Sequence, residues 1–149
     1  MRAWFAILFL WLAAGLCAQQ PAFEEGRARY CAVDIYVDSQ STPLAAYQLE
    51  FSATNGATKI VGIEGGEHSA FHQPPFYDPK AMQHERVIIA AFSTASPDQL
   101  PTGKTRVATI HLQTSNSAPP TFALKLVTAA DSQGNKIPAQ TSFEQKTSK

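Results

Sequence analysis

Short segments that alternate between apolar and polar residues constrain the fold of this chain more than any other feature. Residues 46–54 are the clearest example, because Tyr47, Leu49 and Phe51 fall on one side of an extended strand while the residues between them fall on the other. Outside residues 3–18, no stretch has the spacing of a convincing amphipathic helix. The pattern predicts an all-β protein with strands at residues 30–37, 46–54, 58–63, 86–94, 105–114 and 122–130.

Proline and glycine separate these segments and predict tight turns. Asn55-Gly56 is typical of a hairpin turn between the second and third strands. Residues 131–135 predict a β-turn rather than a calcium loop, because they lack the repeated acidic positions and the closing glutamate. One helical turn is expected within residues 79–85, and residues 136–138 are a further candidate for a short strand. Six or more short strands with such breaks predict an antiparallel β-sandwich.

The first 18 residues have the pattern of an export signal. Arg2 precedes an uncharged apolar stretch and small residues follow it, so we expect cleavage after Ala18. A membrane anchor is one alternative, although about 16 apolar residues are fewer than the roughly 20 that span a bilayer. A lipid on Cys17 is another. We expect a signal peptide, a polar leader, one domain and a flexible C-terminal tail at residues 1–18, 19–29, 30–138 and 139–149, respectively.

The mature chain has the size and charge of a single globular domain. About 131 residues suit one domain. The sequence holds 12 Lys and Arg against 12 Asp and Glu, whereas a nucleic-acid binder usually has a basic excess. Loss of the signal leaves Cys31 as the one cysteine, in a strand-like context that predicts a buried, inert thiol. We therefore expect an exported periplasmic or extracellular domain with no nucleic-acid partner and no membrane span in the mature chain.

The order of the predicted strands resembles that of cohesin domains, which are β-sandwiches of the carbohydrate-binding-module superfamily. The likeness consists of an alternating first strand, an apolar strand ending in Phe51, a strand ending in Gly65, a buried strand, a strand after Gly103, and an apolar strand followed by the pattern Asp-x-x-Gly-Asn. These are residues 32–37, 44–51, 60–65, 86–92, 103–110 and 124–135. The resemblance implies a jelly-roll sandwich. An immunoglobulin- or fibronectin-like sandwich is the alternative.

The same resemblance implies binding without catalysis. Cohesins hold dockerin-bearing proteins, often enzymes of polysaccharide breakdown, and related sandwiches bind polysaccharides directly. The chain departs from the cohesin pattern in a long insert between Glu67 and Glu85. It also shows no second copy of the domain, no dockerin repeat and no catalytic domain, so the resemblance supports a binding role more firmly than a scaffold role.

The insert supplies the candidate binding residues. It gathers aromatic rings, prolines and histidines within residues 68–79. Aromatic side chains held by prolines offer a large contact area at low entropic cost, so Phe71, Phe76 and Tyr77 are candidates for binding a partner or a sugar. The favoured interpretation is instead a loop that closes the open end of the sandwich, with Phe71 and Phe76 plugging the core, because large aromatic side chains dominate core energetics.

The sequence nominates no catalytic or metal site. His68, His72 and His84, with Glu67 or Asp78, are a possible zinc set, but the His-Glu-x-x-His pattern is missing and nearby proline and glycine disfavour a helix. The serines form no Gly-x-Ser-x-Gly elbow, and His111 is expected to be structural. We therefore expect no catalytic residues, metal or cofactor.

Two other functions stay open beside a non-catalytic module that binds a dockerin-like protein or a polysaccharide. One is a small secreted metal-dependent hydrolase that uses the histidine-rich insert. The other is a structural subunit of a surface assembly, which would need an open sheet edge.

Overall fold

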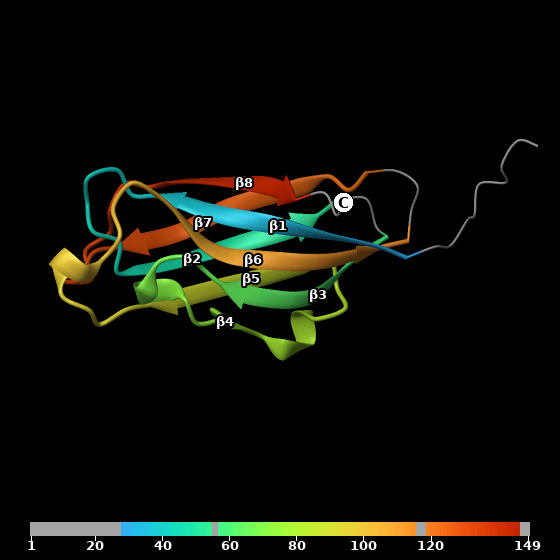
Figure 1. Cartoon of the computed structure of the whole chain (residues 1–149), viewed down its shortest axis with the longest axis horizontal. Coiled ribbons are helices and arrows are strands. Elements are labelled where there is room, and N and C mark those ends of the chain that lie inside the picture. The colour runs from blue at the N-terminus through green and yellow to red at the C-terminus, as the bar shows by residue number, and fades with distance from the viewer. Residues whose placement is uncertain (1–27, 55–56, 116–118, 147–149) are drawn as a thin grey trace, which may run out of the picture.

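The chain forms a two-layer β-sandwich (Figure 1). A computed structural model describes residues 28–54, 57–115 and 119–146. The predicted signal peptide, Cys17, most of the leader and the Asn55-Gly56 turn lie outside these residues. Within the described part, eight strands form: β1 (Arg29–Asp38), β2 (Ala46–Ala53), β3 (Thr58–Gly65), β4 (Phe76–Tyr77), β5 (Arg86–Phe92), β6 (Lys104–Thr114), β7 (Phe122–Ala130) and β8 (Gln140–Lys146).

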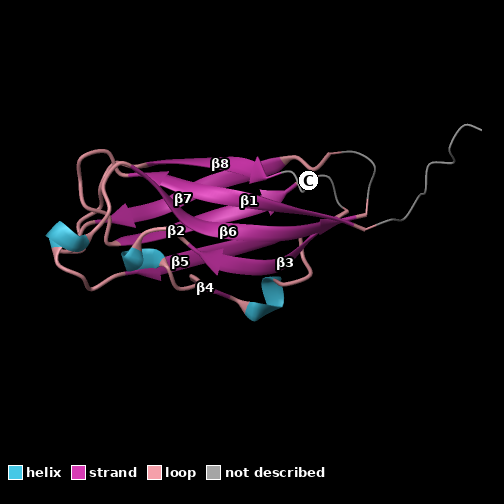
Figure 2. Cartoon of the chain, in the orientation of Figure 1, coloured by secondary structure: helices cyan, strands magenta, loops and turns pink. Residues whose placement is uncertain are grey.

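The eight strands divide equally between two antiparallel sheets. One sheet has the order β3-β6-β1-β8 and the other has the order β4-β5-β2-β7. Strands that neighbour each other in the sequence are often apart in space, so the connections cross from one sheet to the other. Three short 3₁₀ turns, drawn cyan in Figure 2, join the strands: η1 (Ser69–Phe71), η2 (Pro79–Ala81) and η3 (Pro97–Gln99).

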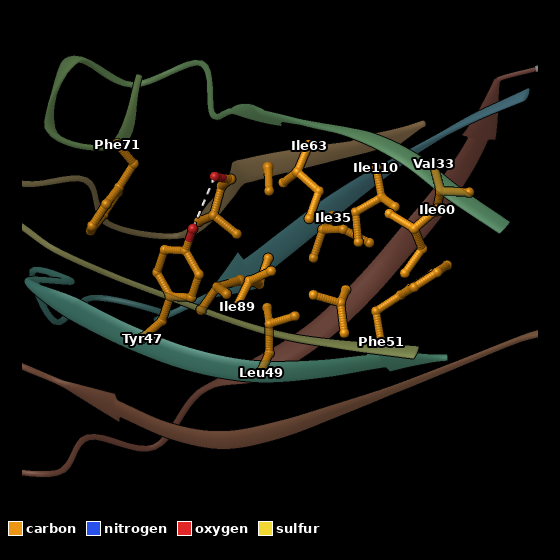
Figure 3. Close-up of a cluster of buried hydrophobic side chains, with 14 of the residues drawn as sticks. Val33, Ile35, Tyr47, Leu49, Phe51, Ile60, Ile63, Phe71, Ile89 and Ile110 are labelled. Atoms are coloured by element: carbon orange, nitrogen blue, oxygen red, sulfur yellow. Dashed lines mark hydrogen bonds between the residues drawn. The ribbon is translucent and has the colours of Figure 1, made fainter. Parts of the chain in front are cut away.

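The core lies between the two sheets and is built by alternation. Tyr47, Leu49 and Phe51 of β2 point inward and are buried, as the sequence predicts (Figure 3). They meet Val33 and Ile35 of β1 from the opposite sheet. The Tyr47 hydroxyl donates a hydrogen bond to the Val107 carbonyl at 3.1 Å, and burial raises the pKa of that hydroxyl. This bond satisfies the one polar group that the ring carries into the core.

The predicted flexible tail is wrong over residues 140–146. These residues form β8, which pairs with β1 from Ala32 to Asp38. Most of β8 is exposed on both sides, so its sequence lacks the alternation by which the other strands were found. Its apolar anchor is Phe143, whose ring lies 5.8 Å from that of Phe122, edge to face. An edge strand of this kind is held by backbone hydrogen bonds. Such bonds do not depend on particular side chains, so the sequence gives little indication of them.

Smaller differences concern short elements. The expected strand at residues 136–138 is a single bridge between Ala130 and Lys136, and the expected helical turn is η2. The two-residue strand β4 was not expected. Cys31 is half-buried in β1, and burial raises the pKa of its thiol although a hydrogen bond with Gln145 acts to lower it. A raised pKa disfavours the reactive thiolate.

Candidate functional site

The three candidate binding residues lie in different environments. Phe71 is buried in η1, and its ring meets that of Tyr47 edge to face at 5.4 Å. It therefore caps the core, as the loop-cap interpretation predicts, and offers no surface to a partner. Tyr77 is half-buried and packs against the core from β4. Phe76, its neighbour on the same strand, points the other way and is 69% exposed, so the expectation that it plugs the core is wrong.

The loop that carries Phe71 is held firmly against β6. The Glu67 carboxylate accepts a hydrogen bond from the Arg106 backbone N–H at 3.0 Å, and the Glu67 N–H donates to the Arg106 carbonyl at 3.0 Å. A Cβ atom at Gly66 would overlap the backbone of Arg106 and Val107, so only glycine permits this approach. The loop therefore presents a fixed shape.

Phe76 pairs with a residue that the sequence did not nominate. Its ring stacks on that of Phe92 from β5, with centroids 6.1 Å apart and planes inclined by 10°. Phe92 is 63% exposed, so both large rings meet solvent. The register places Phe76 opposite Ala90 and Phe92 opposite Ala46, and these small partners leave the rings standing above the sheet.

The two rings belong to a wider apolar surface, which we call the aromatic face. It is the outer side of the β4-β5-β2-β7 sheet. Its exposed apolar side chains alternate along the strands with residues that enter the core, and they are Phe76, Ile88, Phe92 and Val127. The sequence did contain a signal for Ile88 and Phe92, because residues 86–94 are apolar on both sides. That pattern predicts a buried central strand, whereas the side of β5 that carries Ile88 and Phe92 is exposed.

The charged residues of the aromatic face lie toward one end. Glu50 accepts two hydrogen bonds from the Arg86 guanidinium, at 2.8 and 2.9 Å, across the β2–β5 ladder. The hydrogen bond from Arg86 lowers the pKa of Glu50, and the same bond raises the pKa of Arg86. Lys125 lies opposite Glu50 on β7 and is exposed. The charges therefore flank Ile88, while Phe76 and Phe92 lie toward the other end, where Gln48 and Thr128 are in register with Phe76.

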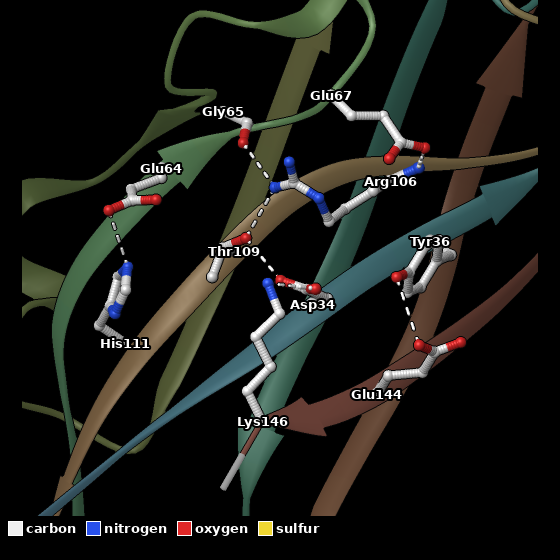
Figure 4. Close-up of polar contacts among 10 residues, drawn as sticks. All are labelled: Asp34, Tyr36, Glu64, Gly65, Glu67, Arg106, Thr109, His111, Glu144 and Lys146. Carbon is white, nitrogen blue, oxygen red and sulfur yellow. Dashed lines mark hydrogen bonds and ion pairs between the residues drawn. The ribbon is translucent and has the colours of Figure 1, made fainter. Parts of the chain in front are cut away.

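The outer side of the other sheet, which we call the polar face, is cross-linked by charges (Figure 4). Asp34 on β1 is only 3% exposed. The Thr109 hydroxyl donates to its carboxylate at 2.7 Å, and the Lys146 ammonium lies 2.7 Å from the other carboxylate oxygen. Burial acts to raise the pKa of Asp34, but these two bonds and the charges of Lys146 and Arg106 together hold it below its ordinary value.

Further pairs complete the polar face. The Lys104 ammonium lies 2.7 Å from Glu144 and 4.4 Å from the centre of the Tyr36 ring. The hydrogen bond from Lys104 lowers the pKa of Glu144. We expected His111 to be structural. Its Nε2 atom lies 3.0 Å from a carboxylate oxygen of Glu64. Oppositely charged groups on this face are thus paired across strands β6, β1 and β8.

The histidines of the insert make local contacts. His68 Nδ1 accepts a hydrogen bond from the Ala70 N–H at 3.2 Å, and His72 Nδ1 lies 2.6 Å from the Ser69 carbonyl oxygen. Across residues 28–54, 57–115 and 119–146, no three His, Cys, Asp or Glu side chains gather closely enough to hold a metal ion. In that same part of the chain, no helix is long and apolar enough to cross a membrane.

Similarity to known proteins was found in three-dimensional structure alone. No family model and no curated protein matches the chain. Two solved structures do. The fold is cohesin-like.

The two structures share the fold at low sequence identity. The first comes from a crystal structure of a complex between CaDoc0917 and CaCohA2, with a TM-score of 0.55 and 12% identity over 76% of this chain and 83% of that one. The second is a non-cellulosomal cohesin from the hyperthermophilic archaeon Archaeoglobus fulgidus, with a TM-score of 0.51 and 11% identity over 76% of this chain and 75% of that one. The all-β, cohesin-like sandwich predicted from the sequence is thereby confirmed.

Proposed function

We propose that this domain is a non-catalytic docking module that binds a dockerin-like protein through the aromatic face. The observation that carries the proposal is the stacked pair of Phe76 and Phe92, 69% and 63% exposed on the outer side of a sheet. Large apolar side chains exposed together mark interaction surfaces in soluble proteins, and aromatic residues contribute much of the energy of such contacts. A protein partner is also supported by the cohesin-like fold, since one of the similar structures is a complex.

The polar face is the weaker candidate for the same role. Asp34 is hydrogen bonded to Thr109 and paired with Lys146, and Glu144 is paired with Lys104. A partner that bound to the polar face would either have to break these hydrogen bonds and ion pairs, or make contacts no more favourable than those that water makes there. On the aromatic face, in contrast, a partner removes apolar surface from water, at about 25 cal/mol for each Å² buried.

The cellular setting is part of the proposal. Residues 1–18 have the pattern of an export signal, so we place the domain in the periplasm or outside the cell. A partner of dockerin type fits a role in holding enzymes of polysaccharide breakdown. The domain itself contributes binding and no chemistry.

Binding of purified dockerin modules by calorimetry tests the proposal. We expect at least one module of a diverse panel to bind the wild-type domain, and Phe92→Ala to weaken that binding by at least about tenfold. The matched control is Tyr30→Ala, because Tyr30 on β1 of the other sheet is exposed to a similar degree, 61%. It should change the affinity less than about twofold.

Two results would contradict the proposal. One is that no dockerin module binds. The other is that Tyr30→Ala weakens binding as much as Phe92→Ala does, since the aromatic face would then have no special part in it.

A further inference from the structure

A hollow of about 630 Å³ opens beside the aromatic face. Its walls come from the loop around η1, from the end of β5 with the residues that follow it, and from η3. These segments lie toward the same end of the sandwich, on the left in Figure 2. The volume is within the range of sites that hold small ligands, about 300–1,000 Å³.

The lining of the hollow lacks strongly charged side chains. No Asp, Glu, Lys or Arg side chain lines the hollow. The side chains with polar atoms carry hydroxyl, amide or imidazole groups, and they are His68, Ser69, Ser93, Thr94 and Gln99. Phe92 adds an exposed aromatic ring. A phosphate or carboxylate ligand would lack a cation here, and a metal ion would lack a carboxylate.

Polar groups of the lining are positioned to bond with a ligand. His68 Nδ1 is occupied by the Ala70 N–H at 3.2 Å, so in the neutral ring the other nitrogen carries the hydrogen and donates. The Ser93 oxygen accepts from the Ala95 N–H at 3.3 Å, which leaves its own hydrogen free to donate. The Gln99 amide supplies both a donor and an acceptor and is exposed.

Both walls are fixed before any ligand arrives. On one side, Glu67 and Arg106 tie the η1 loop to β6, and the buried ring of Phe71 pins it to the core. On the other, the Ser93 N–H donates to the Ala45 carbonyl at 2.8 Å and the Gln99 N–H donates to the Ser96 carbonyl at 2.8 Å. A preformed site loses little conformational entropy on binding.

We propose that this hollow binds a neutral oligosaccharide, with a sugar ring against Phe92 and its hydroxyl groups bonded to the side chains of His68, Ser93 and Gln99. A sugar ring has an apolar C–H face that packs on an aromatic ring, and hydroxyl groups that need donors and acceptors together. The lining offers both, without the charge that an anionic ligand would require. The site does not depend on the docking function, although it shares Phe92 with the aromatic face.

The test is a titration of the isotope-labelled full domain with neutral oligosaccharides, followed by amide NMR. The probes are cellohexaose, xylohexaose and mannohexaose, with oligogalacturonate as the charged comparison. We expect at least one neutral probe to shift the amides of Ser69, Thr94 and Gln99 in a saturable way, and oligogalacturonate to leave them unchanged. Gln99→Ala should weaken binding at least about fivefold and Phe92→Ala at least about tenfold.

Asp98→Ala is the matched control, because Asp98 neighbours Gln99 in η3 but lies outside the lining. It should leave the sugar affinity unchanged, and Gln99→Ala should leave dockerin binding unchanged, so the two proposals fail separately. The sugar proposal is overturned if no neutral probe shifts these amides. It is equally overturned if a dockerin module shifts them and no sugar does, since the hollow would then belong to the protein-docking surface.

Discussion

The two outer faces of the sandwich differ in the kind of side chain that they expose to water. On the polar face, Asp34, Lys146, Lys104 and Glu144 are matched across strands, and a buried carboxylate anchors one of the pairs. On the aromatic face, Phe76 and Phe92 stand exposed and are matched only with each other. Matched charges stabilise the domain itself, whereas exposed rings gain most when another molecule covers them. The difference supports the proposal that one face contributes stability and the other recognition.

The largest effect should follow a charge placed on the aromatic face. Ile88→Asp puts a carboxylate opposite Glu50 and inside the area that a partner would cover. Binding of a dockerin module should weaken at least about 100-fold, because the new charge loses water without gaining a partner. Calorimetry measures the affinity, and Ser142→Asp on β8 of the polar face is the control. An equal loss in both variants would remove the distinction between the faces.

The next effect concerns stability and belongs to the polar face. Asp34→Asn removes the charge that Lys146 and Thr109 stabilise, and the free energy of unfolding should fall by about 2 kcal/mol at neutral pH. Urea denaturation measures it. Dockerin binding by the folded variant should be unaffected, and a loss of binding would show that the polar face takes part in recognition.

The same variant gives a pH dependence with a defined sign. Because the pKa of Asp34 is lowered in the folded state, its contribution is present above its ordinary pKa of 3.8 and is lost as the pH falls through the lowered value. The difference in unfolding free energy between wild type and Asp34→Asn should therefore shrink as the pH falls below 3.8. A difference that stays constant down to acid-unfolding conditions would disprove the assignment.

A smaller effect is expected from salt. Salt screens exposed charges, while contacts between apolar surfaces do not depend on such charges. Raising the salt concentration to about 1 M should change the affinity of the aromatic face for a dockerin module by less than about threefold. A decrease of an order of magnitude would indicate that Glu50, Arg86 or Lys125 dominates the contact.

The smallest effect should come from an exposed pair on the polar face. Glu144 and Lys104 are both largely exposed, and ion pairs in such positions contribute little to stability. Glu144→Gln should leave the thermal unfolding midpoint unchanged within error in calorimetry. A clear drop would mean that the polar face acts as one connected network rather than as separate pairs.

The sequence predicted the parts of this molecule that depend on neighbours along the chain. Alternation placed Tyr47, Leu49 and Phe51 in the core, and the order of the strands indicated the cohesin-like sandwich. It missed β8, whose position depends on backbone pairing with β1. It also nominated Phe71, because a single sequence does not show which ring of an insert turns into the core.

The proposed binding surface was predicted in part. Phe76 was nominated from the insert, but its partner Phe92 lies on β5, and only the pairing of β4 with β5 brings their rings together. The hollow beside them is lined by η1 and η3, two segments separated in the sequence by the rest of the insert and by β5. A pattern along the sequence does not indicate which distant segments come together in the fold.

By itself, the sequence determined that the chain forms strands and which side of each strand enters the core, because polarity with a period of two fixes both. The tertiary structure decided which outer sides of the sheets are exposed to solvent. Ile88 and Phe92 point to the outer side of a sandwich that has two layers in its described part, so no third layer covers them and they meet solvent. It also decided that Asp34 lies under Lys146, because that contact exists only once β8 has paired with β1.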